Sequence, residues 1–348
     1  MSATLERMWY PELPETPAQR LARLPLAAAA VGFRAVVGAR NALYDRGVVR
    51  PRRIAGARVV SVGNLTVGGS GKTPVVIFLA ARFVAAGRSV AVLSRGYGRT
   101  SAREIDFQAD DAPPAEEAGD EPVLIARRCA GVRVYVGADR ARLAERARAR
   151  GADVLVLDDG MQHRRLARDV DVVVVDEAVG FGNEAMLPRG PLREPPHQLR
   201  RASLLWIRAA AVPAPIPEFS GPIVRAVHAP SAVLDPEGAV QPASRLSGFH
   251  VHALCALARP ASFVRTLQSL GAVVTGLSAF GDHHLYTRAE VDRVAARARS
   301  EGALLVTTEK DRVRLPADAP VWTLRLDVRL QSGEAHLDAL LADLARTG

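Results

Sequence analysis

The sequence predicts an α/β protein: a mainly parallel sheet with helices on both faces, followed by a smaller α/β domain. Short β-branched runs alternate with helical stretches from Arg58 onward, a Pro-rich segment interrupts them at residues 210–222, and a second alternation follows. Near-continuous apolar strands between helices are typical of parallel sheets that are buried on both faces. We therefore expect three parts, residues 1–57, 58–212 and 213–348, with the last closing over the functional site.

The alternation assigns each element in order. Strands are expected at residues 59–62, 89–94, 133–137, 154–157, 170–175 and 204–208, with helices at 73–86 and 139–150. Beyond the Pro-rich segment, strands are expected at 250–257, 272–275 and 303–307, with helices at 260–270 and 288–300. Residues 104–121 hold eight acidic and no basic side chains, and we expect an exposed loop there.

The positive charge is concentrated near the N-terminus. The formal net charge is 46 − 37 = +9, and residues 1–58, with ten Arg and four acidic residues, contribute +6 of it. A nucleic-acid-binding protein usually carries its basic charge along the folded body, so we expect no nucleic-acid partner. Cys129 and Cys255 are far apart, which excludes a disulfide scaffold and a cysteine metal knuckle and favours a reducing compartment.

The same N-terminal segment contains an apolar run, residues 24–33, between two arginines. Ten residues are short of the roughly 20 that a membrane-spanning helix needs. Thr16 and Pro17 suit a helix start, Pro25 a kink, and Gly47 a stop after a helix that runs to about Tyr44.

Two interpretations of this helix compete, because Arg20, Arg23 and Arg34 fall on one face of it. It either packs on its own domain with the arginines in water, or lies as a basic amphipathic helix on an anionic leaflet. The concentration of charge favours the membrane-associating helix.

The strongest local motif is VVSVGNLTVGGSGKTP, residues 59–74. A strand, a glycine-rich loop and a helix form the context of a P-loop, whose amides and helix N-terminus bind phosphate. Thr66 stands where the consensus has its first glycine. The alternative is a glycine turn before an ordinary helix, but only two of the 46 basic residues are lysines, and one lies here. We expect a P-loop NTPase-like fold with nucleotide bound by Thr66, Val67, Gly68, Gly69, Ser70, Gly71, Lys72 and Thr73.

A second motif is the acidic end of the strand at residues 154–157, which continues as Asp158 and Asp159. Open α/β sheets bind ligands at the carboxyl ends of their strands. After a P-loop strand, such carboxylates are typical of a Mg²⁺ site, which we assign to Thr73, Asp158 and Asp159. A strand that ends in Asp is also a common turn signal, and the two side chains need not share one role.

Several motifs in a fixed order resemble the tetraacyldisaccharide 4′-kinase family, the lipid A 4′-kinases of Gram-negative bacteria. The resemblance extends from the N-terminal helix to at least Asp311, and Met161 stands where the family usually has Phe or Leu. The motifs are GNLTVGGSGKTP (63–74), SRGYGR (94–99), GDEP (119–122), DDGMQH (158–163), FGN (181–183), LPRGPLREP (187–195), FGDHHLYT (280–287) and TTEKD (307–311).

This resemblance implies an enzyme, a phosphotransferase with an alcohol group as acceptor. It implies that ATP and Mg²⁺ are used to phosphorylate the 4′-hydroxyl of tetraacyldisaccharide 1-phosphate, which gives lipid IVA in lipid A and lipopolysaccharide biosynthesis. It also implies a peripheral or monotopic position at the cytoplasmic face of the bacterial inner membrane. The expected partners are the acylated disaccharide lipid and an anionic membrane surface, with no obligate protein partner.

The resemblance also changes how individual residues are interpreted. Asp120 by itself suits a helix N-cap, but in the family pattern it is the candidate base, with His283 orienting it or sharing its proton. Lys72 and Asp159 complete the catalytic set. Four further residues are candidates at the phosphate or sugar: Gln162, His163, Arg193 and Glu194. The role of Lys310 stays open, since a lysine between Glu309 and Asp311 could form a solvated pair.

Two other functions fit parts of the sequence. A membrane-recruited switch ATPase of the partitioning type has a similar loop, but with an additional lysine where this chain has Val67. A P-loop enzyme that activates a small soluble carboxylate, such as a biotin-pathway ligase, leaves the basic N-terminal helix and FGDHHLYT unexplained.

Overall fold

A computed structural model describes residues 8–10 and 17–346 and separates the chain into two units, which are described in turn. The first comprises Met1–Arg95, Asp139–Val227 and Arg329–Gly348, and the second Gly96–Ala138 and His228–Val328. The boundaries expected at 57 and 212 divide the chain differently, because the chain passes between the units four times. It does so after Arg95 and after Ala138, and then within β8 (Ile223–Leu234) and within β13 (Trp322–Ser332).

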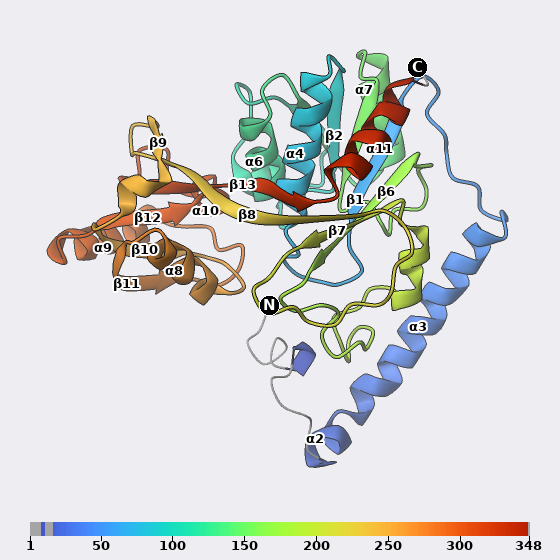
Figure 1. Cartoon of the computed structure of the whole chain (residues 1–348), viewed down its shortest axis with the longest axis horizontal. Helices are drawn as coiled ribbons and strands as arrows, with labels where there is room; N and C mark the ends of the chain where they lie inside the picture. Colours follow the sequence, from blue (N-terminus) through green and yellow to red (C-terminus); the bar gives the residue numbers. More distant parts are fainter. Residues whose placement is uncertain (1–7, 11–16, 347–348) are drawn as a thin grey trace. The chain divides into compact units, whose positions relative to one another are not determined.

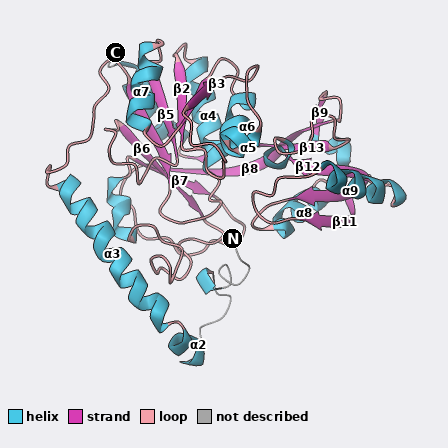
Figure 2. Cartoon of the chain, turned by 180° about the vertical axis from the view of Figure 1, so that it is seen from behind, coloured by secondary structure: helices cyan, strands magenta, loops and turns pink. Residues whose placement is uncertain are grey.

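The first unit is built on a parallel sheet in the order β8-β7-β6-β1-β5-β2, against which α4 and α7 pack (Figure 2). Strands β2 and β5 are buried along their whole length, as expected for a sheet covered on both faces. These elements confirm the predicted class and lie within one residue of their predicted bounds. They are β1 (Arg58–Gly63), α4 (Lys72–Ala85), β2 (Val90–Ser94), α7 (Arg140–Ala149), β5 (Val154–Asp158), β6 (Val170–Asp176) and β7 (Leu204–Arg208), with η1 (Pro196–Arg201) and α11 (Glu334–Arg346) in addition.

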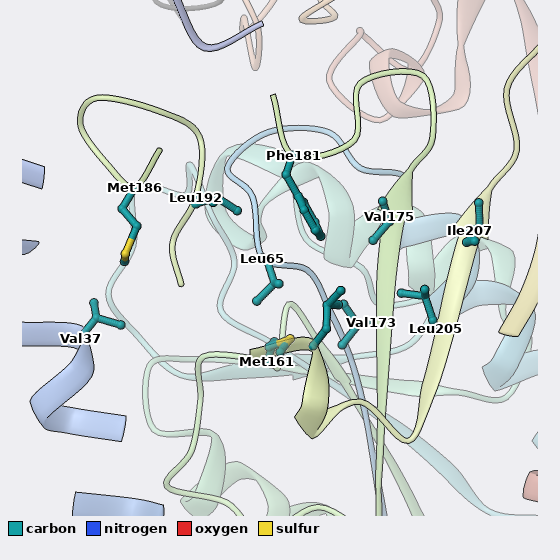
Figure 3. Packing of buried hydrophobic residues seen from close by; sticks show 11 residues of the cluster. Val37, Leu65, Met161, Val173, Val175, Phe181, Met186, Leu192, Leu205 and Ile207 are labelled. Carbon is teal, nitrogen blue, oxygen red and sulfur yellow. The ribbon is translucent and has the colours of Figure 1, made fainter. Parts of the chain in front are cut away.

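One core cluster of the first unit lies beneath the loops that carry the sequence motifs (Figure 3). Alternate residues of β6 and β7, among them Val173 and Leu205, point into it, as the two-residue period of a strand requires. Leu65, from the loop after β1, and Met161, from the turn after β5, are fully buried in the same cluster. The glycine-rich loop and the acidic turn are therefore anchored to one hydrophobic core.

The N-terminal helix runs to about Tyr44, as predicted, but in two pieces (Figure 1). It is interrupted at Arg23, between α2 (Pro17–Ala22) and α3 (Leu24–Asp45), so the break expected near Pro25 lies two residues before that proline, which sits in the first turn of α3. Gly47 ends it as expected, with φ +71° and its N–H donating to the Tyr44 carbonyl. Thr16 lies outside the described residues.

The ten-residue apolar run is part of a longer helix. Helix α3 has 22 residues, Arg34 and Arg40 among them, and by length and composition alone it is long and apolar enough to cross a membrane. One stripe of the helix, which includes Val37 and Asn41, packs on the first unit. The other face exposes Val31 (69%) and Val36 (70%).

The second unit contains a parallel sheet in the order β11-β10-β12-β13 with helices on both faces. Val251 on β10 packs with Phe263 of α8, whereas Leu254 on the same strand packs with Val291 of α9. The elements are β9 (Val240–Pro242), η2 (Ala243–Leu246), β10 (His250–Cys255), α8 (Pro260–Ser269), β11 (Val273–Ala279), α9 (Arg288–Ser300), β12 (Leu304–Thr308) and α10 (Glu309–Arg312).

Residues 96–138 also belong to the second unit, and the prediction of an exposed acidic loop at residues 104–121 within them is wrong. Strands β3 (Ile105–Phe107) and β4 (Arg133–Val136) pair antiparallel, and α5 (Ala115–Ala118) precedes α6 (Asp120–Arg128). Phe107, Ala115 and Ala118 are buried. Apolar residues that pack inward alternate in sequence with the acidic residues. The number of charges therefore did not indicate that this segment is folded.

Candidate active site

The glycine-rich loop joins β1 to α4 and places Lys72 in the first turn of the helix. Gly68 and Gly71 have φ values of +104° and +81°, a region that favours glycine, and Gly71 is the N-cap of α4. Thr73 follows Lys72 and is buried. The helix N-terminus, its backbone amides and one lysine are thus arranged as anion binding requires.

Asn64, which sequence reasoning missed, connects this loop internally. Its side-chain amide donates to Thr66 Oγ1 (3.2 Å) and Ser70 Oγ (2.9 Å), and its Oδ1 accepts from Lys72 Nζ (3.2 Å). The residue is fully buried. A buried amide that satisfies both donors and its acceptor within one loop holds that loop in a single shape.

The acidic turn lies beside this loop because β1 and β5 are neighbours in the sheet. Val62 pairs with Asp158 in the parallel register, and the Gly160 N–H donates to the Val62 carbonyl (2.9 Å). Asp159 has φ +52°, and Arg140 on α7 donates to the carbonyls of both Asp158 and Asp159 (3.0 Å each). The buried Arg140 guanidinium therefore holds this left-handed turn. Like Asn64, Arg140 was not among the site residues predicted from the sequence.

The Asp159 carboxylate lies between two cations. Its Oδ1 is 3.5 Å from Lys72 Nζ, and its Oδ2 accepts from Arg193 (2.7 Å). Burial by itself would raise the pKa of Asp159, but the charges of Lys72 and Arg193, the Arg193 hydrogen bond and Arg140 lower it to about 2. Asp159 is therefore ionised throughout the neutral range, and Lys72 is bound by it and by Asn64.

The oxygen donors near this turn suit Mg²⁺. Asp159 Oδ1 is buried and accepts no hydrogen bond from the described residues, and Asp158 Oδ2 is oriented by the Ser94 hydroxyl (2.9 Å). Mg²⁺ in phosphoryl-transfer sites is usually held by one or two carboxylates together with substrate phosphates and water. Among the described residues there is no group of three or more His, Cys, Asp or Glu that could hold a metal ion.

Gln162 and Arg193 are brought to the same cluster. Gln162 donates to the Asn64 carbonyl (2.9 Å) and accepts from Arg193 (3.2 Å). The Arg193 N–H donates to the Leu65 carbonyl (2.7 Å), so the segment around it runs alongside the loop. These two residues join the glycine-rich loop to the acidic turn.

His163 and Glu194 lie in surroundings that the sequence did not suggest. Burial and the charges of Arg140 and Arg168 lower the pKa of His163 to about 3, so its imidazole is neutral. Glu194 is fully buried and binds Asn41 of α3 (2.9 Å), Arg40 (3.1 Å) and Arg201 (2.8 Å). Glu194 therefore anchors α3 to the rest of the first unit. Its carboxylate is bound by residues of the protein itself, which does not suit the predicted contact with the phosphate or sugar.

Asp120 and His283 form a hydrogen-bonded pair within the second unit. His283 Nδ1 lies 2.9 Å from Asp120 Oδ2, and Asp120 Oδ1 accepts from the Glu121 N–H (2.9 Å). Asp120 is the first residue of α6, whose N-cap is Gly119 rather than Asp120. The sequence boundary at 212 put the two residues in different domains, whereas the fold places both in one unit.

Tyr97, from the SRGYGR motif, lies beside this pair. Its ring contacts the His283 ring edge-on, with centroids 5.5 Å apart, and it is 73% exposed. It lies between Gly96 and Gly98, which have φ values of +70° and +77°. An exposed aromatic side chain fixed beside a buried carboxylate was not among the predicted site residues, although its motif had been noted.

A lysine-bearing phosphate loop and a carboxylate turn at the carboxyl edge of a parallel sheet define a P-loop phosphotransferase or nucleotide hydrolase. Comparison with known proteins specifies the family. A model of the tetraacyldisaccharide-1-P 4′-kinase family, LpxK, matches residues 22–346. The chain belongs to this family, which confirms the resemblance drawn from the motifs.

Individual relatives support the assignment along almost the whole chain. A tetraacyldisaccharide 4′-kinase of Anaeromyxobacter dehalogenans (strain 2CP-C) is 50% identical in an alignment of 361 positions, gaps included, that covers 97% of this chain and 94% of the relative. One of Syntrophus aciditrophicus is 39% identical, with 92% and 90% covered. The crystal structure of LpxK from Aquifex aeolicus in complex with ATP, described as an "apo" form, superposes with a TM-score of 0.79 at 30% identity, covering 93% of this chain and 99% of that one.

Proposed function

We propose that this chain transfers the γ-phosphate of ATP to the 4′-hydroxyl of tetraacyldisaccharide 1-phosphate, which yields lipid IVA in lipid A biosynthesis. The observation that carries this conclusion is the family match over residues 22–346, which covers the phosphate loop in the first unit and the Asp120–His283 pair in the second. The partitioning-type ATPase and the carboxylate-activating enzyme are not favoured, because neither accounts for a match of that extent.

On the phosphate side, the loop residues 66–73 bind the triphosphate through backbone amides at the N-terminus of α4. Lys72 leaves Asn64 and Asp159 to contact the β- and γ-phosphates, which replace Asp159 as its anionic partner. Arg193, held by Asp159 and Gln162, adds a second cation close to the same anions. Thr73, Asp158 and Asp159 would hold Mg²⁺, which when bound neutralises triphosphate charge.

On the acceptor side, the Asp120–His283 pair takes the proton of the sugar hydroxyl. The 4′-oxygen then forms a bond to the γ-phosphorus as the bond from that phosphorus to the β-phosphate oxygen breaks, and ADP leaves with the electron pair. The pair suits this role because the carboxylate is buried while the imidazole is partly exposed. Both sets of residues act on one pair of substrates, so closure of the smaller domain on the bound substrates is part of the proposal.

The test is incubation of the full chain with ATP, Mg²⁺ and tetraacyldisaccharide 1-phosphate in detergent micelles, followed by mass spectrometry of the lipid. We expect one added phosphate per lipid and one ADP formed per product. ATP hydrolysis without lipid phosphorylation would instead support a switch ATPase. Turnover that needs a soluble carboxylate and ignores the lipid would support the ligase.

The proposal extends to the membrane at which the lipid resides. Helix α3 exposes apolar residues along one face, Leu24, Val31 and Val36 among them, while the segment that follows it exposes Arg50 and Arg53. An apolar helix face beside exposed arginines suits the interface of an anionic leaflet. We place the chain at the cytoplasmic face of the inner membrane, where ATP is available.

A flotation assay with vesicles containing anionic phospholipid tests this placement. The full chain should float with the vesicles, and Val31→Asp/Val36→Asp should lower its partition at least about tenfold, because two apolar side chains no longer enter the leaflet. Val212→Asp is the matched control, since Val212 is also exposed but lies outside α3. Failure of the wild-type chain to float, or equal partition of both variants, would contradict the placement.

A further inference from the structure

Lys310, one of the two lysines in the chain, lies beside the Asp120 carboxylate. Its Nζ is 3.7 Å from Asp120 Oδ2 and 3.6 Å from Glu121 Oε1, and its side chain is 25% exposed. The solvated pair suggested by the sequence does not form. Glu309 is bound by Arg128 (2.6 Å) and Arg325 (3.1 Å), and Asp311 turns inward. Lys310 is therefore directed to the acids that begin α6.

A second cation faces the same oxygen from the turn after α10. The Arg314 side chain is 2% exposed, and its Nε lies 3.9 Å from Asp120 Oδ2. Its Nη2 donates to Asp311 (2.6 Å), a fully buried carboxylate that also accepts from the Tyr286 hydroxyl (3.0 Å) and the Ala256 N–H (3.0 Å). Arg314 is thus fixed by a buried network that draws on several elements.

Together with His283, these cations favour the ionised form of Asp120. Burial would raise the pKa of Asp120, which is 4% exposed, but the His283 hydrogen bond and the charges of Lys310, His283 and Arg314 lower it to about 2. The other charged groups facing this cluster are acidic: Glu121 on α6, 3.6 Å from Lys310 Nζ, and Asp282 in the loop of His283, 3.9 Å from His283 Nε2.

We propose that Lys310 and Arg314 are positioning residues that hold Asp120 ionised and directed at His283 before each phosphoryl transfer. The inference rests on the proposed function of the Asp120–His283 pair. A proton that remained on Asp120 would leave two cations without a neutralising charge, so the pair returns its proton to solvent after each turnover. Arg314 is immobilised by Asp311, whereas Lys310 is partly exposed on a flexible stem and can be replaced with less disturbance.

The test compares Lys310→Met and Lys310→Arg by the pH dependence of kcat/KM for lipid phosphorylation. Loss of a cation favours the protonated pair, so its apparent pKa rises and the acid limb moves to higher pH. We expect an upward shift of about one pH unit for Lys310→Met. Lys310→Arg keeps the charge and should retain the wild-type limb.

Two controls separate this role from a general structural one. Arg288→Gln removes a cation of the same unit whose ion pairs go to Asp292 and Asp318, and it should leave the limb unchanged. NMR titration of the Asp120 carboxyl carbon follows the pair without turnover, so it applies to Lys310→Gln as well should Lys310→Met fold poorly. The pKa of Asp120, about 2 in the wild-type chain, should rise in either neutral variant.

An unchanged acid limb and an unchanged Asp120 titration in the neutral variants would overturn the inference. So would a raised KM for ATP or lipid with an unmoved limb, because Lys310 would then contact a substrate phosphate rather than serve the pair. Failure of the wild-type chain to phosphorylate the lipid would count against the proposed function instead, while the NMR titration would still report on Lys310 and Asp120.

Discussion

Asp120→Asn should lower kcat for lipid phosphorylation by about 10²–10⁴-fold, the usual contribution of a positioned general base, with little change in either KM. Asparagine keeps the shape of the side chain but cannot accept a proton at neutral pH. His283 then loses its carboxylate partner 2.9 Å away. Steady-state kinetics with varied ATP and varied lipid measure kcat and both KM values separately.

Combining this variant with His283→Ala tests whether the two residues act as one unit. Residues that serve a single step are not additive, so the double variant should be no slower than about the slower single variant. Glu117→Gln is the matched control, because it removes an exposed carboxylate from the neighbouring α5. A folded Asp120→Asn protein with near-wild-type turnover would reject the base assignment. If the loss of kcat in the double variant equalled the product of the two single losses, the paired action would be rejected.

The sequence predicted those parts of the fold whose signal is local. The buried strands β1, β2, β5, β6 and β7 consist of apolar runs, and parallel pairing of β1 with β5 explains why the glycine-rich loop and Asp158 were correctly expected at one edge. Strands β8 and β13 were missed because charged or proline residues interrupt them, as in the LRLDVRL stretch of β13. Their pairing depends on neighbours that lie far away in the chain.

The residues of the candidate site likewise divide into those that a local motif predicts and those that only the folded structure brings together. Lys72, Thr73 and Asp159 follow from motifs whose residues are adjacent in sequence. Asn64 was missed because an asparagine in a loop carries no distinctive pattern until its three partners are seen around it.

Glu194, in contrast, was predicted as a site residue although its carboxylate does not face the site. It lies next to Arg193 in sequence and was grouped with it, yet its carboxylate turns inward to Asn41 and Arg201. Arg314 and Lys310 gather at Asp120 only because α10 packs against α6, a contact that no local pattern encodes.

Lys72→Met should lower kcat by about 10²–10³-fold or more, the usual loss when one preorganised electrostatic group is removed from a transition state. The wild-type ammonium is held 3.2 Å from Asn64 Oδ1 and 3.5 Å from Asp159 Oδ1, next to the loop that binds phosphate. Methionine retains the length of the stem without the charge. Turnover assays together with calorimetric titration of ATP measure catalysis and nucleotide affinity.

Lys72→Arg is the sharper variant, because this chain otherwise uses Arg for 44 of its 46 basic residues. A planar guanidinium cannot replace a compact ammonium where Asn64 and Asp159 approach from different sides, so arginine should recover little of the lost activity. Arg82→Met is the matched control on the same helix, since its partly exposed pairs with Glu334 and Asp338 contribute at most about 1 kcal/mol. Nearly full activity in Lys72→Arg would mean that positive charge alone suffices at this position, and the preference for lysine would then need another cause.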